Sequence, residues 1–285
     1  MKSLVLVLSL AAVSAVSASS LTNLVVHSAK MDKDVPVTLV LPDGYDASGA
    51  TRYPSIWVLH GAGGSGARKA GEKIVGDAVD KYGFIAVCPD GGVTSWWLDS
   101  PIDPKFQYET FVIQEALPEV DAKFRTIPER TKRAIMGGSM GGHGACYLGM
   151  RHKDLFGAIG NVYGGVDLVP WGSNWDIAKR LGPRDQFPER WEEHSVLHVA
   201  KSLKNGEVEL ISVLGTEDFF LGCNRQLHEL LSNNGVAHTY VEVRAPSTLK
   251  SVHGKFYAQG AEIALRFIRN YFVDGYGHLG DLDAR

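Results

Sequence analysis

Residues 137–141 read Gly-Gly-Ser-Met-Gly, which is a G-x-S-x-G turn. The apolar run 133–136 before this turn is typical of a buried strand, and a helical pattern follows from Gly141 to Arg151. A strand, this turn and a helix together lift one serine hydroxyl clear of a sheet. Glycine at the flanking positions permits a tight turn and positive φ, which a Cβ atom would penalise. Ser139 is therefore the first candidate for a reactive side chain.

Strand and helix patterns alternate along the rest of the chain. Besides the strand before Ser139, runs rich in β-branched and aromatic residues predict strands at 24–27, 35–41, 55–59, 84–88, 158–163, 208–214 and 239–244. Helical patterns cover 67–81, 109–124, 141–151, 224–233 and 255–272. This alternation predicts an α/β protein with a mostly parallel, doubly wound sheet and helices on both faces. With the serine turn in place, we expect the α/β-hydrolase fold.

One segment, residues 168–201, departs from this alternation. It is rich in tryptophan and proline, and short helices are expected at 174–180 and 188–193. Ligands of doubly wound sheets bind at the carboxyl ends of the strands, in the loops that can vary without disturbing the core. We therefore expect this insertion, which carries Trp171, Trp175 and Trp191, to wall a substrate pocket.

The amino-terminal residues have the pattern of a secretory signal peptide. Lys2 precedes an apolar run at 4–13 and a stretch of small residues at 15–18. The apolar core is too short for a bilayer span, which needs about 20 residues. We expect residues 1–18 to be removed, residues 19–285 to form a single domain, and the protein to be secreted or periplasmic.

Composition and charge narrow the possible partners. The 285-residue chain has a formal net charge of −3, which argues against a nucleic-acid partner because such domains are normally basic. Its three cysteines are too few for a disulfide scaffold, and no Cys occupies a turn like that of Ser139. No second apolar span follows the signal sequence, so the mature protein is expected to lack a membrane span.

A serine nucleophile needs a general base and an acid that orients the base. In this fold the chain order is Ser, then Asp or Glu, then His. His253 follows the last predicted strand and precedes the last helix, as a base reaching this edge of the sheet should. The acid should follow strand 208–214, where Glu217 and Asp218 both qualify and spacing does not choose between them.

The oxyanion of a tetrahedral intermediate needs two backbone N–H groups. Met140, directly after the serine, supplies the first, and the loop His60-Gly61-Ala62-Gly63-Gly64 can supply the second through Ala62. This loop lacks the Gly-Lys-Ser/Thr ending of a P-loop and the spacing of a dinucleotide fingerprint. The histidines and carboxylates form no metal-ligand motif either, so neither a cofactor nor a catalytic metal is expected.

Several motifs together resemble the Putative esterase (esterase D-like) family of α/β-hydrolases, over about residues 36–272. They are the glycine-rich loop 60–64, Gln-Tyr-Glu-Thr at 107–110, Arg-Thr-Ile-Pro at 125–128, Gly-Ser-Met-Gly-Gly-His-Gly at 138–144 and Gly-Thr-Glu-Asp-Phe at 215–219. The family includes tributyrin esterases, S-formylglutathione hydrolases, feruloyl and acetylxylan esterases of carbohydrate esterase family 1, and mycolyltransferases. One departure is local: many relatives have a Gly-Gly-His turn at the base, where this chain has Ser-Val-His at 251–253.

The resemblance implies a role for each of these site residues. Ser139 corresponds to the nucleophile, Asp218 to the acid and His253 to the base, with Ala62 and Met140 as oxyanion donors. Relatives carry a Trp-Trp/Tyr-x-Asp segment near the pocket, which implies that Trp97, Tyr108 and Glu109 contact the substrate. The alternative for the last three is that the aromatic residues anchor a loop and Glu109 caps a helix start.

These observations predict a secreted serine carboxylesterase acting on short-chain acyl, acetyl or feruloyl esters, including esters on plant polysaccharide. The signal sequence argues against S-formylglutathione, a thioester expected in the cytosol. Two alternatives are an acyltransferase of the mycolyltransferase type, which uses an alcohol acceptor in place of water, and a non-catalytic carbohydrate-binding relative.

Overall fold

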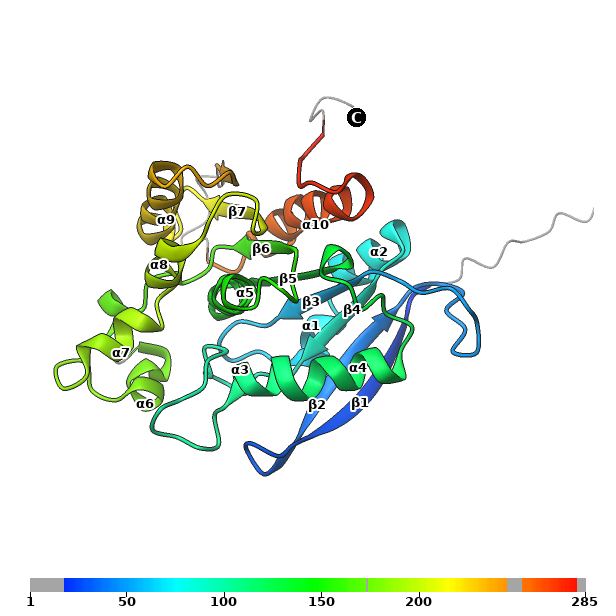
Figure 1. Ribbon diagram of the computed structural model, residues 1–285, viewed down its shortest axis with the longest axis horizontal. Coiled ribbons are helices and arrows are strands. Elements are labelled where there is room, and N and C mark those ends of the chain that lie inside the picture. Colours follow the sequence, from blue (N-terminus) through cyan, green and yellow to red (C-terminus); the bar gives the residue numbers. More distant parts are fainter. Residues whose placement is uncertain (1–17, 173, 245–252, 281–285) are drawn as a thin grey trace, which may run out of the picture.

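The computed structural model describes residues 18–172, 174–244 and 253–280 (Figure 1). Within them, eight strands form one sheet in the order β1-β2-β4-β3-β5-β6-β7-β8. Antiparallel pairing joins β1 (Ser20–Ser28), β2 (Lys33–Leu41) and β4 (Ile85–Pro89). Parallel pairing joins β4, β3 (Ser55–Leu59), β5 (Arg133–Gly138), β6 (Ala158–Val162), β7 (Glu209–Gly215) and β8 (Thr239–Val243).

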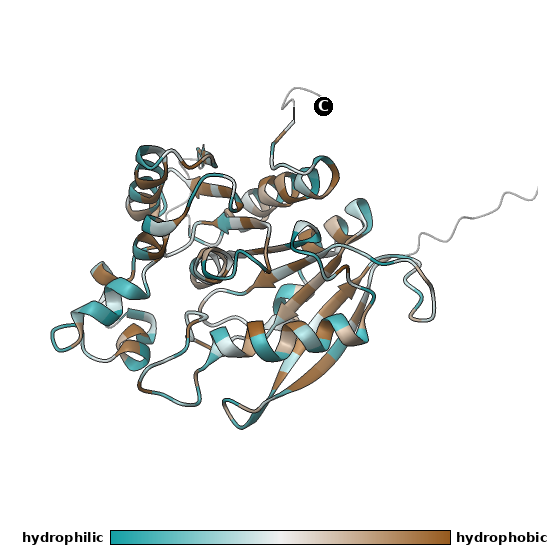
Figure 2. Cartoon of the chain, viewed as in Figure 1, coloured by the Kyte–Doolittle hydropathy of each residue, from teal (hydrophilic) through white to brown (hydrophobic). Residues whose placement is uncertain are grey.

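All eight strands predicted from the sequence are confirmed. Every residue of β3, β4, β5 and β6 is buried, because helices cover both faces of this central part of the sheet. The edge strand β1 instead alternates, with Leu24 and Val26 buried and Val25 exposed. Figure 2 shows mostly hydrophobic colour along the central strands. Helix α4 (Leu117–Lys123), which covers the sheet, shows alternating hydrophilic and hydrophobic bands.

Helices cover the two faces as expected for an α/β-hydrolase (Figure 1). One face packs against α1 (Gly66–Ala70), α2 (Lys73–Tyr82) and α10 (Tyr257–Asp274). The other packs against α3 (Tyr108–Thr110), α4, α5 (Met140–Arg151), α8 (Val196–Val199) and α9 (Leu221–Asn233). The sheet is therefore the middle layer of three, and the fold class predicted from the sequence is confirmed.

Two of the predicted helices are less regular than expected. The helix expected over 67–81 is divided into α1 and α2, because Gly71 disfavours helix and Glu72 has extended backbone at the start of α2. The helix expected over 109–124 begins as α3, widens into a π-helical segment at Phe111–Ala116 and continues as α4. Pro118 has no amide hydrogen to donate, which favours such a local change in the bonding pattern.

The insertion after β6 contains short helices and lies at one end of the molecule (Figure 1). α6 (Ile177–Leu181) follows a 3₁₀ turn at Asn174–Asp176, and α7 (Pro188–Glu193) has the bounds predicted from the sequence. The Thr94 hydroxyl donates a hydrogen bond to Asp176 Oδ2 at 2.9 Å, and Trp96 Nε1 donates one to the Trp175 carbonyl at 3.1 Å. These bonds tie the insertion to the loop that follows β4.

The predicted signal peptide lies outside the described residues, apart from its last residue, Ala18. In the part of the chain that the structure describes, no helix is both long enough and apolar enough to cross a bilayer. Cys88 and Cys146 are buried in the core.

Candidate active site

Ser139 occupies a strained corner between β5 and α5. Its backbone has φ 60° and ψ −123°, which is outside the regions that a residue with a side chain normally adopts. Such a conformation costs on the order of 1–3 kcal/mol and persists only where the surrounding structure imposes it. Here the Ser139 N–H donates to the Val162 carbonyl at 3.1 Å, and the Ser139 carbonyl accepts from the His143 N–H at 3.0 Å.

The glycines of the corner are required by close backbone approach. A Cβ atom on Gly141 would lie 2.1 Å from the Leu59 carbonyl oxygen, and one on Gly137 would lie 2.4 Å from the Gly141 carbonyl oxygen. Both distances are far below van der Waals contact. These glycines therefore let α5 start directly against β3 and β5, with Ser139 at the junction.

The structure brings Ser139, His253 and Asp218 into one hydrogen-bonded chain. Ser139 Oγ lies 2.8 Å from His253 Nε2, and His253 Nδ1 lies 2.9 Å from Asp218 Oδ2. The carboxylate only accepts, so Nδ1 carries the proton and Nε2 is free to accept the hydroxyl hydrogen of Ser139. This is the tautomer that a general base needs.

Only one of the two candidate acids reaches His253. Asp218 is buried, with 6% of its surface exposed, and its Oδ1 accepts from the Phe220 N–H at 2.8 Å. Glu217 is exposed. The tight turn in which the Asp218 N–H donates to the Gly215 carbonyl points the two neighbouring side chains in different directions.

Aromatic rings surround the His253 imidazole. Phe219 stacks on it with ring centroids 4.2 Å apart, and Tyr163 packs edge-on at 4.8 Å. Trp175 stacks in turn on Phe219 at 5.7 Å, and Trp171 packs against both of these rings. The sequence pointed to the insertion with Trp171, Trp175 and Trp191; the first two lie here, whereas Trp191 is completely buried in the core. Tyr163 and Phe219 were missed. The Phe-Phe pair directly after Asp218 was the available signal.

The glycine-rich loop lies against Ser139. A Cβ atom on Gly61 would be 3.3 Å from Ser139 Cβ, so only glycine fits there without displacing its neighbours. The Gly63 N–H donates to the Val93 carbonyl at 2.9 Å and fixes the far side of the loop. Among the described residues, the N–H groups of Ala62 and Met140 donate to no protein group. Both therefore remain available for a substrate oxygen.

His60 holds this loop in place, and both of its ring nitrogens are engaged by backbone groups. Its ring is buried; Nδ1 donates to the Gly61 carbonyl at 2.8 Å and Nε2 accepts from the Gly91 N–H at 2.8 Å. Burial lowers the pKa of His60, which favours the neutral ring that this pair of bonds requires.

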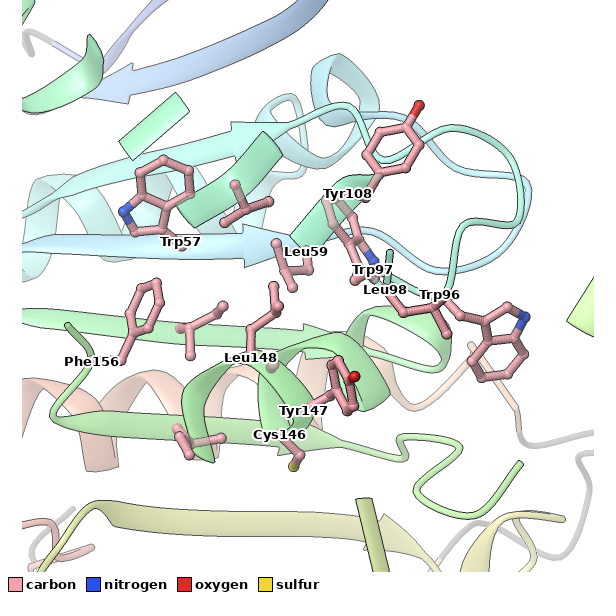
Figure 3. Close-up of a cluster of buried hydrophobic side chains, with 14 of the residues drawn as sticks. Trp57, Leu59, Trp96, Trp97, Leu98, Tyr108, Cys146, Tyr147, Leu148 and Phe156 are labelled. Atoms are coloured by element: carbon pink, nitrogen blue, oxygen red, sulfur yellow. The ribbon is translucent and has the colours of Figure 1, made fainter. Parts of the chain in front are cut away.

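Trp97 was expected to contact the substrate, but the structure buries it completely. Its Nε1 donates to the His60 carbonyl at 3.2 Å, and its ring fills the space beside Gly91 and Gly144. Figure 3 shows Trp97 within the buried cluster, beside Leu59 at the end of β3. The prediction is therefore corrected: Trp97 supports the glycine-rich loop from within the core, through its bond to the His60 carbonyl.

Tyr108 and Glu109 are also buried supports, contrary to the prediction that they contact the substrate. The Tyr108 hydroxyl accepts from Lys33 Nζ at 3.2 Å, and burial raises its pKa to about 12. Glu109 accepts from Arg151 Nε at 2.8 Å and lies 2.7 Å from His152 Nε2, so it is bound to the end of α5. These contacts agree with the loop-anchoring alternative for Tyr108.

The sequence profile of the family described as Putative esterase matches residues 28–255. This chain belongs to that family. It is 29% identical to an esterase of Mycobacterium tuberculosis over 236 residues, which are 73% of this chain and 51% of that protein. The chain thus spans about half the length of this relative. It is also 24% identical to the S-formylglutathione hydrolase of Rattus norvegicus, with 70% of this chain and 73% of that protein covered.

Among solved structures, a ferulic acid esterase is similar in fold to this chain. It superposes with a TM-score of 0.75 at 23% identity, covering 90% of this chain and 99% of the other. At this identity the likeness supports the α/β-hydrolase fold and leaves the substrate of the present protein to be argued from its own residues.

Proposed function

We propose that the protein is a secreted serine carboxylesterase. The observation that carries this proposal is the hydrogen-bonded chain from Ser139 Oγ through His253 to Asp218, with Ser139 at a strained corner. Membership of an esterase family supports the same reaction class.

In the proposed reaction, Ser139 Oγ attacks the carbonyl carbon of an ester while His253 Nε2 takes the hydroxyl proton. The N–H groups of Met140 and Ala62 donate to the oxyanion, and removal of one comparable donor typically costs about 10²–10³ in rate. The tetrahedral intermediate then expels the alcohol, which receives the proton from His253. Water, activated by the same imidazole, hydrolyses the acyl-enzyme and restores Ser139. Asp218 stabilises the imidazolium in both halves.

Aromatic side chains beside His253 support an aryl or short acyl group as the substrate's acid part. Phe219 packs against Trp175 and the imidazole and is still 45% exposed, so a flat group entering here meets an apolar aromatic surface. We therefore retain acetyl, short-chain acyl and feruloyl esters as the substrates, in line with the name of the ferulic acid esterase of similar fold.

Secretion is part of the proposal and rests on the sequence of residues 1–18. Expression of the full chain in a secreting host should release a protein whose first residue is near Ser19. Amino-terminal sequencing of the culture supernatant checks this, and retention of Met1 in the recovered protein would contradict it.

The proposed chemistry is tested with 4-nitrophenyl acetate, 4-nitrophenyl butyrate and a feruloyl ester. Ser139→Ala should abolish hydrolysis of every ester that the wild type cleaves, because no other group can form the acyl-enzyme. Ser232→Ala, which alters an exposed serine of α9, is the matched control and should retain full activity. Equal rates for wild type and Ser139→Ala would refute the assignment of the nucleophile.

A further inference from the structure

Two adjoining hollows lie beside the Ser139–His253 pair and share the side chains of Lys69 and Glu72. The first, about 170 Å³, is lined also by the loop from His60 to Ser65 and by Arg68. The second, about 430 Å³, is lined also by Lys73, Tyr163, Gly254 and Lys255. We name the two together the basic groove.

Each hollow of the basic groove is lined by residues that adjoin Ser139 or His253. In the first hollow, Gly61 lies against Ser139. In the second, Gly254 directly follows His253, and the Tyr163 ring packs on the His253 imidazole at 4.8 Å. The groove therefore adjoins the catalytic pair through Gly61, Tyr163 and Gly254.

A buried ion pair forms the shared wall of the groove. Lys69 is only 8% exposed, its Nζ donates to Glu72 Oε1 at 2.8 Å, and it sits 3.6 Å above the centre of the Tyr257 ring. The second Glu72 oxygen, Oε2, and the Tyr257 hydroxyl are buried without a hydrogen-bond partner among the described residues. Glu72 is thus already committed to Lys69, and it is the one carboxylate among the described residues that line the groove.

The remaining charges of the groove are positive. Lys73 is paired with Asp77, which lies outside the groove, at 2.7 Å. Arg68 and Lys255 are exposed and form no ion pair within the described ranges. Arg68 and Lys255, which form no ion pair among the described residues, therefore flank a neutralised pair and give the groove a positive net charge.

From these positions we propose that the basic groove binds the alcohol part of the ester, and that it favours leaving groups carrying a carboxylate. The inference rests on the proposed esterase function, in which His253 protonates the departing oxygen. The aromatic side, through Phe219, and the groove, through Tyr163, both adjoin the imidazole, so charge is what distinguishes them. The aromatic side formed by Phe219 and Trp175 offers no charge and suits the acyl part. The two sides thus fix the direction in which an ester lies across Ser139.

Two esters that differ by one carboxylate test the proposal. They are 4-nitrophenyl acetate and 5-acetoxy-2-nitrobenzoate, which share the acetyl group and the nitrophenolate leaving group. We expect kcat/KM to be about fivefold higher for the carboxylate ester at low ionic strength, and this preference to shrink in about 0.5 M salt, because exposed charges are screened. Ser139→Ala should abolish cleavage of both.

Variants locate the preference in the groove. In Arg68→Gln/Lys255→Gln the ratio of the two kcat/KM values should fall toward one, and Arg68→Glu, which changes the net charge of the groove by the same amount, should lower it to a similar extent. Lys204→Gln, an exposed lysine that precedes β7 at the opposite end of the sheet, is the matched control and should keep the wild-type ratio.

Each outcome separates the two proposals. Ser139-dependent cleavage of both esters at equal kcat/KM would refute the proposed carboxylate preference of the basic groove, while the esterase function would stand. A preference for the carboxylate ester that survives in Arg68→Gln/Lys255→Gln would also overturn the role of the groove. Failure of the wild type to cleave either ester would instead count against the esterase function itself.

Discussion

Asp218 and Glu217 are neighbours in sequence with opposite environments. The Asp218 carboxylate is buried and bonded to both His253 and the Phe220 N–H, whereas Glu217 is exposed to solvent. A buried acid at this position holds the imidazole in one tautomer and stabilises its positive charge. An exposed acid at the preceding position, such as Glu217, does neither.

Asp218→Asn should therefore lower kcat by about 10⁴, as in an analogous triad, because the amide would favour the wrong tautomer of His253. Glu217→Gln removes the same charge one residue earlier and should stay within about twofold of wild type, as expected for a surface substitution. The rates of 4-nitrophenyl acetate hydrolysis by the two variants decide the matter. Similar losses in both would show that His253 depends on the charge of the turn as a whole.

At the scale of residues, spacing did not choose between these two acids; the family resemblance, and not the spacing, implied Asp218. Chain order located Ser139, His253 and the acidic turn, because the fold brings the carboxyl ends of β5, β7 and β8 to one edge. Side-chain direction within the turn depends on the Gly215–Asp218 hydrogen bond, which no spacing reveals. Trp97 was misplaced for a similar reason: its burial depends on the space left beside Gly91 and Gly144.

At the scale of elements, strands were predictable and helix interruptions were not. A parallel strand buried on both faces has a short, continuous apolar signature, as in β3 and β4. The break between α1 and α2 instead depends on one glycine and on the extended backbone of Glu72. That break places Lys69 and Glu72 in the shared wall of the basic groove, where they pair with each other.

The junction of β5 with α5 leads to a prediction about glycine. Gly141→Ala should destabilise the fold by about 3 kcal/mol, the upper range for overpacking, because its Cβ would lie 2.1 Å from the Leu59 carbonyl oxygen. Gly222→Ala, in the helix α9 with no atom within 4 Å of the added Cβ, should stabilise by about 0.4–1 kcal/mol. Urea denaturation measures both. A Gly141→Ala protein as stable as wild type would show that the junction can relax.

At the scale of the whole molecule, His143 joins three parts of the structure. It lies on α5 with no exposed surface, and its Nδ1 and Nε2 face the carbonyls of Trp96 and His194 at 3.0 and 2.9 Å. The Trp96 carbonyl belongs to the loop after β4. The His194 carbonyl belongs to the insertion, directly after α7. The side chain therefore links the helix behind Ser139 to the segments that shape the site.

This position makes stability depend on pH. Burial lowers the pKa of His143 from 6.5 to about 4, although the two carbonyls oppose the shift. The unfolded chain thus binds a proton at a higher pH than the folded chain does. The contribution of His143 is intact above pH 6.5 and is lost as the pH falls toward 4. Between pH 7 and 5 the loss should be on the order of 2 kcal/mol.

Replacing His143 should remove that part of the pH dependence. His143→Gln keeps a polar side chain that does not titrate, so its free energy of unfolding should fall less than that of wild type between pH 7 and 5. His27→Gln, which alters an exposed histidine of β1, should follow the wild-type curve. Urea denaturation at several pH values compares the three slopes, irrespective of any constant offset in stability. Parallel curves for wild type and His143→Gln would mean that the acid sensitivity of this fold originates elsewhere.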